Sequence, residues 1–212
     1  MDFVTIDFET ANSSRASACS IGVVEIIGGV ITAERSWLIN PQQHFDAMNI
    51  SIHNITPSMV QDAPTFGELW PELLPYLENK HVVAHNAAFD MSVLRHSLDA
   101  ASAGYPAFQY YCTYLLSKKI LNELPSHRLN NLAAYFGIEL NHHDALEDAR
   151  AAALVLLQLM ERKQQFTPAE LSAAFGYKPG TLYSGGYTAF SAAASKTKKP
   201  GSWKKSSLGR YS

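Results

Sequence analysis

The chain has 212 residues, of which 47% are hydrophobic and 17% are charged, as in a globular protein with one sizeable core. No apolar run is long enough to span a bilayer, and the first ten residues lack the basic start and long apolar middle of a signal peptide. The two cysteines are too few for a disulfide framework. These features predict a reduced, soluble, cytoplasmic protein with no membrane partner.

The net charge of −2 conceals an uneven distribution along the chain. Residues 1–177 carry 10 Lys and Arg against 19 Asp and Glu, a balance of −9, whereas residues 178–212 carry 7 Lys and Arg and no acid, a balance of +7. An acidic body is not typical of a protein that binds nucleic acid by charge alone. The distribution suits an acidic metal site followed by a basic auxiliary tail.

The first element predicted along the chain is a β-strand at residues 3–10, which are rich in β-branched and aromatic residues. Side chains alternate along a strand, so Asp7 and Glu9 point to one face and Phe8 to the other. Two neighbouring carboxylates repel each other unless a cation lies between them. Taken alone, Asp-x-Glu occurs by chance in many proteins, and a solvent-facing edge with two charges is the favoured interpretation of the pair.

Two more strands follow in an antiparallel meander, and strands then alternate with helices, which favours a mixed sheet with helices packed on it. The two-residue turn Gly28-Gly29 predicts a hairpin between the second and third strands. Strands are predicted at 19–27, 30–39, 81–85 and 108–112, and helices at a short stretch from 57 and at 65–78, 90–101, 113–121, 129–136 and 144–162.

Two more acidic residues fall in the first turns of predicted helices. Asp90 follows a strand-to-helix turn, at the sheet edge where ligands of open α/β sheets commonly bind. A first-turn acid favoured by the helix dipole is the alternative for Asp90. Asp148 follows the capping residue Asp144 at the start of the last long helix, and His143 lies just outside that helix. An unpaired carboxylate at the edge of the core is costly, so Asp148 is expected to have a partner.

The composition changes near the C-terminal end of the chain. A short helix capped by Thr167 is expected, and from Tyr177 the abundance of Gly, Ser, Ala and Lys predicts a flexible basic tail. The alternative is an arm that binds a nucleic-acid strand, in which the lysines contact phosphates and Trp203 stacks on a base. The chain therefore divides into a domain at 1–165 and a short helix with a flexible basic tail at 166–212.

Three motifs occur in a fixed order: Asp7-x-Glu9, then Asp90 at the end of His85-Asn86-Ala87-Ala88-Phe89-Asp90, then His143 five residues before Asp148. They resemble the three motifs of the DEDDh family of 3′–5′ exonucleases, which includes the proofreading epsilon subunit of bacterial DNA polymerase III and ribonuclease T. The resemblance covers residues 2–162 and indicates the histidine subgroup. It implies an α/β, ribonuclease H-like fold with a five-stranded mixed sheet flanked by helices.

The resemblance also implies two bound Mg²⁺ ions, for which Mn²⁺ can substitute. Four carboxylates without a cysteine cluster suit such oxygen-preferring ions. On this hypothesis Asp7 bridges both ions, while Glu9 and Asp148 hold the ion that carries the attacking water. Asp90 supports the second ion, and His143 accepts the proton of the water.

Three neighbours of the motifs are candidate substrate contacts. Thr10 is placed to contact the terminal sugar through its backbone, and Phe8 or Phe89 is placed to wedge against the terminal base. Packing in the core is the alternative for both aromatic side chains.

The expected function is that of a metal-dependent 3′–5′ exonuclease, which releases nucleoside 5′-monophosphates from 3′ ends of single-stranded DNA in proofreading or repair. A polymerase is a candidate partner. Trimming of RNA 3′ ends is the alternative, because the motifs recognise phosphate and metal and do not distinguish the two sugars. An inactive nucleic-acid-binding module is a third hypothesis, and the presence of all five motif residues argues against it.

Overall fold

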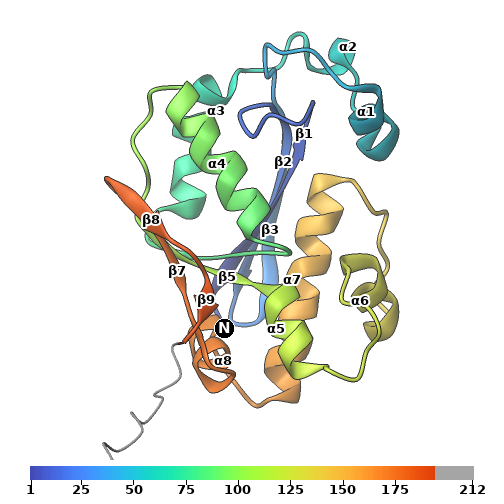
Figure 1. The fold of residues 1–212 in the computed structure, drawn as a ribbon, viewed down its shortest axis with the longest axis vertical. Coiled ribbons are helices and arrows are strands. Elements are labelled where there is room, and N and C mark those ends of the chain that lie inside the picture. Colours follow the sequence, from blue (N-terminus) through green and yellow to red (C-terminus); the bar gives the residue numbers. More distant parts are fainter. Residues whose placement is uncertain (194–212) are drawn as a thin grey trace, which may run out of the picture.

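The computed structural model describes residues 1–193. A seven-stranded mixed sheet runs through the molecule in the strand order β3-β2-β1-β4-β5-β7-β8, and helices lie on both of its faces (Figure 1). β1, β4 and β5 are parallel to one another, and β2, β3, β7 and β8 join them by antiparallel pairing. The strands are β1 (Phe3–Thr10), β2 (Ala18–Ile27), β3 (Val30–Leu38), β4 (His81–Ala84), β5 (Phe108–Cys112), β6 (Tyr177–Lys178), β7 (Gly180–Tyr183), β8 (Gly186–Thr188) and β9 (Ser191–Ala192).

The hairpin predicted in the first part of the chain is confirmed. Gly28 and Gly29 connect β2 to β3 with φ angles of 63° and 86°. This left-handed conformation favours glycine, and it matches the twist of the two flanking strands. The meander of β1, β2 and β3 therefore forms one half of the sheet, and β1 lies in its interior between β2 and β4.

The two faces of β1 meet different helices. Phe8 packs against Phe66 of α3, with ring centroids 6.5 Å apart. Thr5 points the opposite way, because its hydroxyl donates to the carbonyl of Ala149 in α7 at 2.7 Å. Asp7 and Glu9 share the face of Thr5. The helices are α1 (Ala47–His53), α2 (Pro57–Val60), α3 (Phe66–Leu77), α4 (Ala88–Ala100), α5 (Thr113–Ile120), α6 (Leu129–Phe136), α7 (Ala145–Arg162) and α8 (Pro168–Ala174).

Helix α7 begins directly against the sheet. Its predicted cap is confirmed, because the Asp144 carboxylate accepts hydrogen bonds from the backbone N–H groups of Leu146 at 2.9 Å and Glu147 at 3.3 Å. Gly22 of β2 permits the close approach, since a Cβ at that position would overlap the backbone of Ala145. Gly22 pairs with Asp7 across the β1–β2 ladder, so the first turn of α7 lies next to Asp7.

The sheet has seven strands rather than the five that were expected. The flexible tail predicted from Tyr177 is wrong for residues 177–192, which form β6 to β9. The β7–β8 hairpin extends the sheet beyond β5, and β6 pairs with β9 in a separate two-stranded sheet. Leu182 of β7 is 1% exposed and joins the main core, which explains why this segment is ordered. The rest of the predicted tail, residues 194–212, lies outside the described residues.

Two further features are the state of the cysteines and the character of the helices. Cys19 and Cys112 are both buried free thiols. None of the helices within residues 1–193 has both the length and the apolar character that crossing a bilayer requires.

Candidate active site

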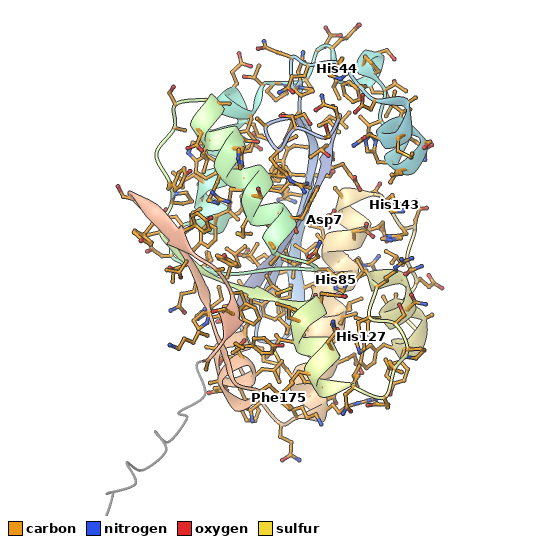
Figure 2. All side chains as sticks on the ribbon, in the orientation of Figure 1. Asp7, His44, His85, His127, His143 and Phe175 are labelled. Carbon is orange, nitrogen blue, oxygen red and sulfur yellow. The ribbon has the colours of Figure 1, made fainter. Side chains whose placement is uncertain are left out.

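Asp7 and Glu9 project from one face of β1 next to the start of α7. Both side chains are half-buried, and their oxygens lie within 4.8 Å of each other and of the Asp148 carboxylate. Figure 2 shows Asp7 in the middle of the molecule between α4 and α7, with His85 and His143 nearby. The structure thus brings together three carboxylates that the sequence separates by up to 141 positions.

Asp90 joins the group from the other side of β1. Asp90 is 1% exposed, and its Oδ1 accepts a hydrogen bond from the backbone N–H of Phe8 at 3.1 Å. Its Oδ2 is buried without a hydrogen-bond partner among the described residues. A buried carboxylate oxygen without a partner is costly, so this atom is suited to a ligand that the protein alone does not supply.

Asp148 lies in the first turn of α7 and is 4% exposed. His142 Nδ1 lies 2.8 Å from its Oδ1 and 3.0 Å from its Oδ2. The backbone N–H of His143 donates to Oδ2 at 3.1 Å, and His143 has a left-handed φ of 73°. The two imidazole rings stack with their centroids 3.9 Å apart. Both histidines therefore adjoin Asp148, although the sequence reasoning assigned a site role to His143 alone.

The charges in this cluster are unfavourable without a counter-ion. Burial is the main cause that raises the pKa of Asp7 well above its usual value, and the neighbouring carboxylates Asp90, Asp148 and Glu9 raise it further. Burial and the same kind of repulsion raise the pKa of Glu9 to about 8. Burial also raises the pKa of Asp90 to about 7.

The donor set fits a divalent cation. Its atoms are carboxylate oxygens, including the partnerless Oδ2 of Asp90, and such oxygens are the ligands that Mg²⁺ and Mn²⁺ prefer. Asp7, Glu9 and Asp148 form one potential ligand group. A bound cation would also relieve the repulsion that raises the pKa values of these residues.

The second motif is supported by a partly buried polar contact and by the backbone conformation of its turn. His85 Nδ1 lies 2.9 Å from the hydroxyl of Thr113, and burial lowers the pKa of His85 to about 4. Asn86 has a left-handed φ of 63° at the turn from β4 into α4. These features hold the turn that leads to Asp90.

The two aromatic candidates for substrate contact differ in their surroundings. Phe8 is 2% exposed and packs on Phe66, which is the arrangement that the core-packing alternative expects. Phe89 is half-buried, and the guanidinium carbon of Arg15 lies 4.2 Å from its ring centroid. Of the two predicted wedges, only Phe89 has an accessible ring.

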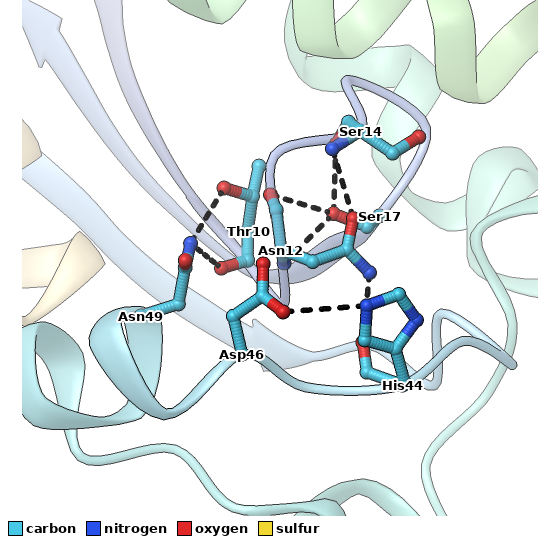
Figure 3. A network of polar contacts seen from close by, with 7 residues as sticks. All are labelled: Thr10, Asn12, Ser14, Ser17, His44, Asp46 and Asn49. Atoms are coloured by element: carbon cyan, nitrogen blue, oxygen red, sulfur yellow. Dashed lines mark hydrogen bonds and ion pairs between the residues drawn. The ribbon is translucent and has the colours of Figure 1, made fainter.

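A polar network holds Thr10 at the end of β1 (Figure 3). Its carbonyl accepts from Asn49 Nδ2 at 2.8 Å and contacts His53 Nε2 at 3.1 Å. His53 Nδ1 accepts from the Ile55 N–H at 2.9 Å, so the Nε2 atom carries the proton and donates. The carbonyl of Thr10 therefore already accepts two hydrogen bonds. A sugar hydroxyl could bind this oxygen only by displacing Asn49 or His53.

The same network ties the β1–β2 turn to the segment that leads into α1. Asn12 Nδ2 donates to the carbonyl of His44 at 2.7 Å, and the Ser17 hydroxyl lies 3.2 Å from the backbone N–H of Asn12. His44 and Asp46 form an ion pair at 3.3 Å when the histidine is protonated. Helix α1, which the sequence reasoning missed, is thereby fixed beside the end of β1.

A model of the RNase T exonuclease family matches residues 4–156, a range that includes every motif residue. The chain belongs to this exonuclease family. The assignment confirms the resemblance to DEDDh exonucleases. This exonuclease-family chain is 34% identical over 173 residues to a PolC-type DNA polymerase III of Thermotoga maritima, and the alignment covers 80% of the chain and 13% of the relative. The chain spans 11% to 26% of the length of several curated relatives that it matches.

Solved structures of exonucleases share the fold. Exonuclease X in complex with 5′ overhanging duplex DNA superposes with a TM-score of 0.65 and 24% identity, covering 82% of this chain and 99% of that one. The nuclease domain of 3′hExo, a DEDDh family member bound to rAMP, gives a TM-score of 0.67 and 16% identity, covering 78% and 94%. These similarities confirm the ribonuclease H-like fold.

Proposed function

We propose that this chain is a metal-dependent 3′–5′ exonuclease, which releases nucleoside 5′-monophosphates from the 3′ ends of single-stranded DNA in proofreading or repair. The observation that carries the proposal is the convergence of Asp7, Glu9 and Asp148 within 4.8 Å beside the partnerless oxygen of Asp90. Full ionisation of such a cluster is unfavourable without cations, and its carboxylate oxygens have the ligand chemistry of phosphoryl-transfer sites.

The four carboxylates would hold two Mg²⁺ ions, or Mn²⁺ in their place. When bound, such ions stabilise the attacking and leaving oxygens of an in-line phosphoryl displacement. In this proposal Asp7 contributes to both ion sites, Glu9 and Asp148 to one, and Asp90 to the other.

His143 would accept the proton of the attacking water. Its side chain is exposed, and burial of part of the ring is the first cause that lowers its pKa below the usual imidazole value. The neutral form, which accepts protons, is then the main form at pH 7. The Asp148 carboxylate, which binds the backbone N–H of His143, positions the loop that carries the imidazole.

DNA is the proposed substrate because the Thermotoga relative is a DNA polymerase and because exonuclease X was solved with DNA. A polymerase is accordingly a candidate partner of this chain, in the cytoplasm. RNA is the second candidate substrate, because 3′hExo was solved with rAMP. All five motif residues lie within residues 1–165, which we assign as the exonuclease domain.

The test is degradation of 5′-labelled single strands of one sequence, as DNA and as RNA, with Mg²⁺, Mn²⁺ or EDTA. We expect a ladder that shortens from the 3′ end of DNA, a nucleoside 5′-monophosphate product, and no cleavage in EDTA. Faster cleavage of RNA would assign the chain to RNA turnover with the same site. Absence of cleavage with both metals would contradict the proposal and favour a binding module.

A further inference from the structure

A cavity of about 400 Å³ opens beside the carboxylates on the side of α5 and α6. Asp7 and Asp148 line it together with Tyr114 of α5 and Arg128, the residue that precedes α6. The cavity therefore joins the candidate metal site to a cation and an aromatic ring that lie outside the three motifs.

Within residues 1–193, the cations Arg128 and Lys118 on this side have no acidic partner. Arg128 is exposed, and among residues 1–193 no carboxylate oxygen lies within 4.0 Å of its guanidinium nitrogens. The same holds for Lys118, whose ammonium lies 5.4 Å from the ring centroid of Tyr114. Because residues 1–177 carry a balance of −9, such cations beside the carboxylate cluster are the groups that an incoming polyanion would contact.

The ring of Tyr114 is held in place before any ligand arrives. It is half-buried and meets the ring of His85 edge-on, at 5.7 Å between centroids and 81° between planes. His85 is itself fixed by its 2.9 Å contact with Thr113. A fixed aromatic ring at the margin of a polar cavity is a surface on which a nucleobase can stack.

The two sides of the carboxylate cluster differ in character. Figure 2 shows His44, beside the locked end of β1, on one side of Asp7 and His85 on the other. The ring of Phe89 contacts Arg15 of the β1–β2 turn, so Phe89 lies toward the end of β1, and as a candidate wedge it would place the 3′-terminal nucleotide on that side. The cavity that contains Tyr114 and Arg128 is a separate opening onto Asp7 and Asp148. A strand whose last nucleotide lies near Phe89 and whose scissile phosphate lies at the carboxylates needs such an opening for its preceding nucleotides.

We propose that this cavity binds the nucleotides on the 5′ side of the scissile phosphate. Arg128 binds a backbone phosphate of that part of the strand, and Tyr114 stacks on its base. Both residues position the substrate and take no part in the chemistry. The inference rests on the proposed exonuclease function, and it adds where the rest of the strand lies.

The test compares two substrates, a 5′-labelled 20-nucleotide DNA strand and the p-nitrophenyl ester of thymidine 5′-monophosphate. The ester contains the terminal nucleotide and the scissile phosphate but has no nucleotide on the 5′ side. For Arg128→Ala we expect kcat/KM on the strand to fall about tenfold or more. The slope of log(kcat/KM) against log salt concentration should become shallower by about one, because one phosphate contact is lost. Its kcat/KM on the ester should stay within about twofold of the wild type.

Tyr114→Ala should lower kcat/KM on the strand about five- to 100-fold without changing the salt dependence, whereas Tyr114→Phe, which keeps the ring, should retain the wild-type value. The matched control is Arg35→Ala, which removes an exposed arginine from β3 outside the cavity. It should match the wild type on both substrates.

The outcomes separate this inference from the proposed function. If the wild type cleaves both substrates and Arg128→Ala equals it on the strand, the inference is overturned while the exonuclease function stands. Equal losses of Arg128→Ala on strand and ester also overturn it, because the residue would then act at the scissile phosphate. A wild type that cleaves neither substrate overturns the proposed function and this inference with it.

Discussion

Asp7→Asn should lower kcat by a factor of roughly 10³ or more, about 4 kcal/mol of transition-state stabilisation. Asp7 has a carboxylate oxygen within 4.8 Å of Glu9 and of Asp148, and Asp90, Asp148 and Glu9 all raise its pKa. An amide at this position keeps the shape of the side chain but removes its negative charge, so cation binding is lost. The measurement is single-turnover cleavage of labelled DNA at saturating Mg²⁺, with the exposed Asp62→Asn as the matched control.

The same substitution should stabilise the metal-free protein. The pKa of Asp7 is higher in the folded state than in the unfolded state. Below the usual pKa near 4, Asp7 is protonated in both states and does not affect the free energy of unfolding. As the pH rises from there toward the folded-state pKa, ionisation favours the unfolded state, so the folded protein loses stability. Asp7→Asn removes that loss. In EDTA its thermal midpoint should exceed that of the wild type at pH 8, by more than at pH 5. A lower midpoint than the wild type at pH 8 would contradict the account of the cluster.

His143→Ala should lower kcat by about 10²- to 10⁴-fold, the usual contribution of a general base. His142→Ala should remain within about tenfold of the wild type. The imidazole of His142 contacts the oxygens of Asp148 that a cation would bind. A bound cation would therefore displace the imidazole of His142 from Asp148. His143 contacts Asp148 through its backbone N–H, so this hydrogen bond does not occupy the imidazole nitrogens.

The measurement for the histidines is the pH dependence of kcat in Mg²⁺. Activity of the wild type should fall as the pH drops below the ordinary imidazole value, because the pKa of His143 is lowered and only its neutral form accepts a proton. His143→Ala should lose this acidic limb, and His142→Ala should keep it. A larger loss in His142→Ala than in His143→Ala would show that the two residues have exchanged roles.

The elements that carry the site could be predicted because each has a strong local signal. β1 combines β-branched residues with two alternate carboxylates, and α7 begins at the capping residue Asp144. Both signals act over a few residues, so they do not depend on the rest of the fold. The order of the motifs then indicated which carboxylates meet.

The strands at residues 177–192 have a composition typical of a linker, which conceals their pattern. Gly, Ser and Ala are abundant in linkers, but Leu182 and Tyr187 pair across a turn that contains Gly185, with a φ of 99°. This is a hairpin signal that the sequence contains. The pairing of β7 with β5, in contrast, is a long-range contact that no local pattern encodes.

Side-chain roles beyond the motifs also depend on tertiary geometry. The contact of His142 with Asp148 follows from the left-handed backbone of His143, and the position of Arg128 beside the carboxylates follows from the path between α5 and α6. The packing of Phe8 on Phe66 is likewise a tertiary contact that the local sequence does not specify. Such placements require the packed structure.

The central claim is that four carboxylates from β1, α4 and α7 form a site for two divalent ions. The most direct test is anomalous diffraction from crystals soaked in Mn²⁺, with Asp7→Asn crystals as the control. The account predicts two manganese peaks in the wild type, one in contact with Glu9 and Asp148 and the other with Oδ2 of Asp90, and their loss in the variant. A wild type with no manganese at these residues would contradict it.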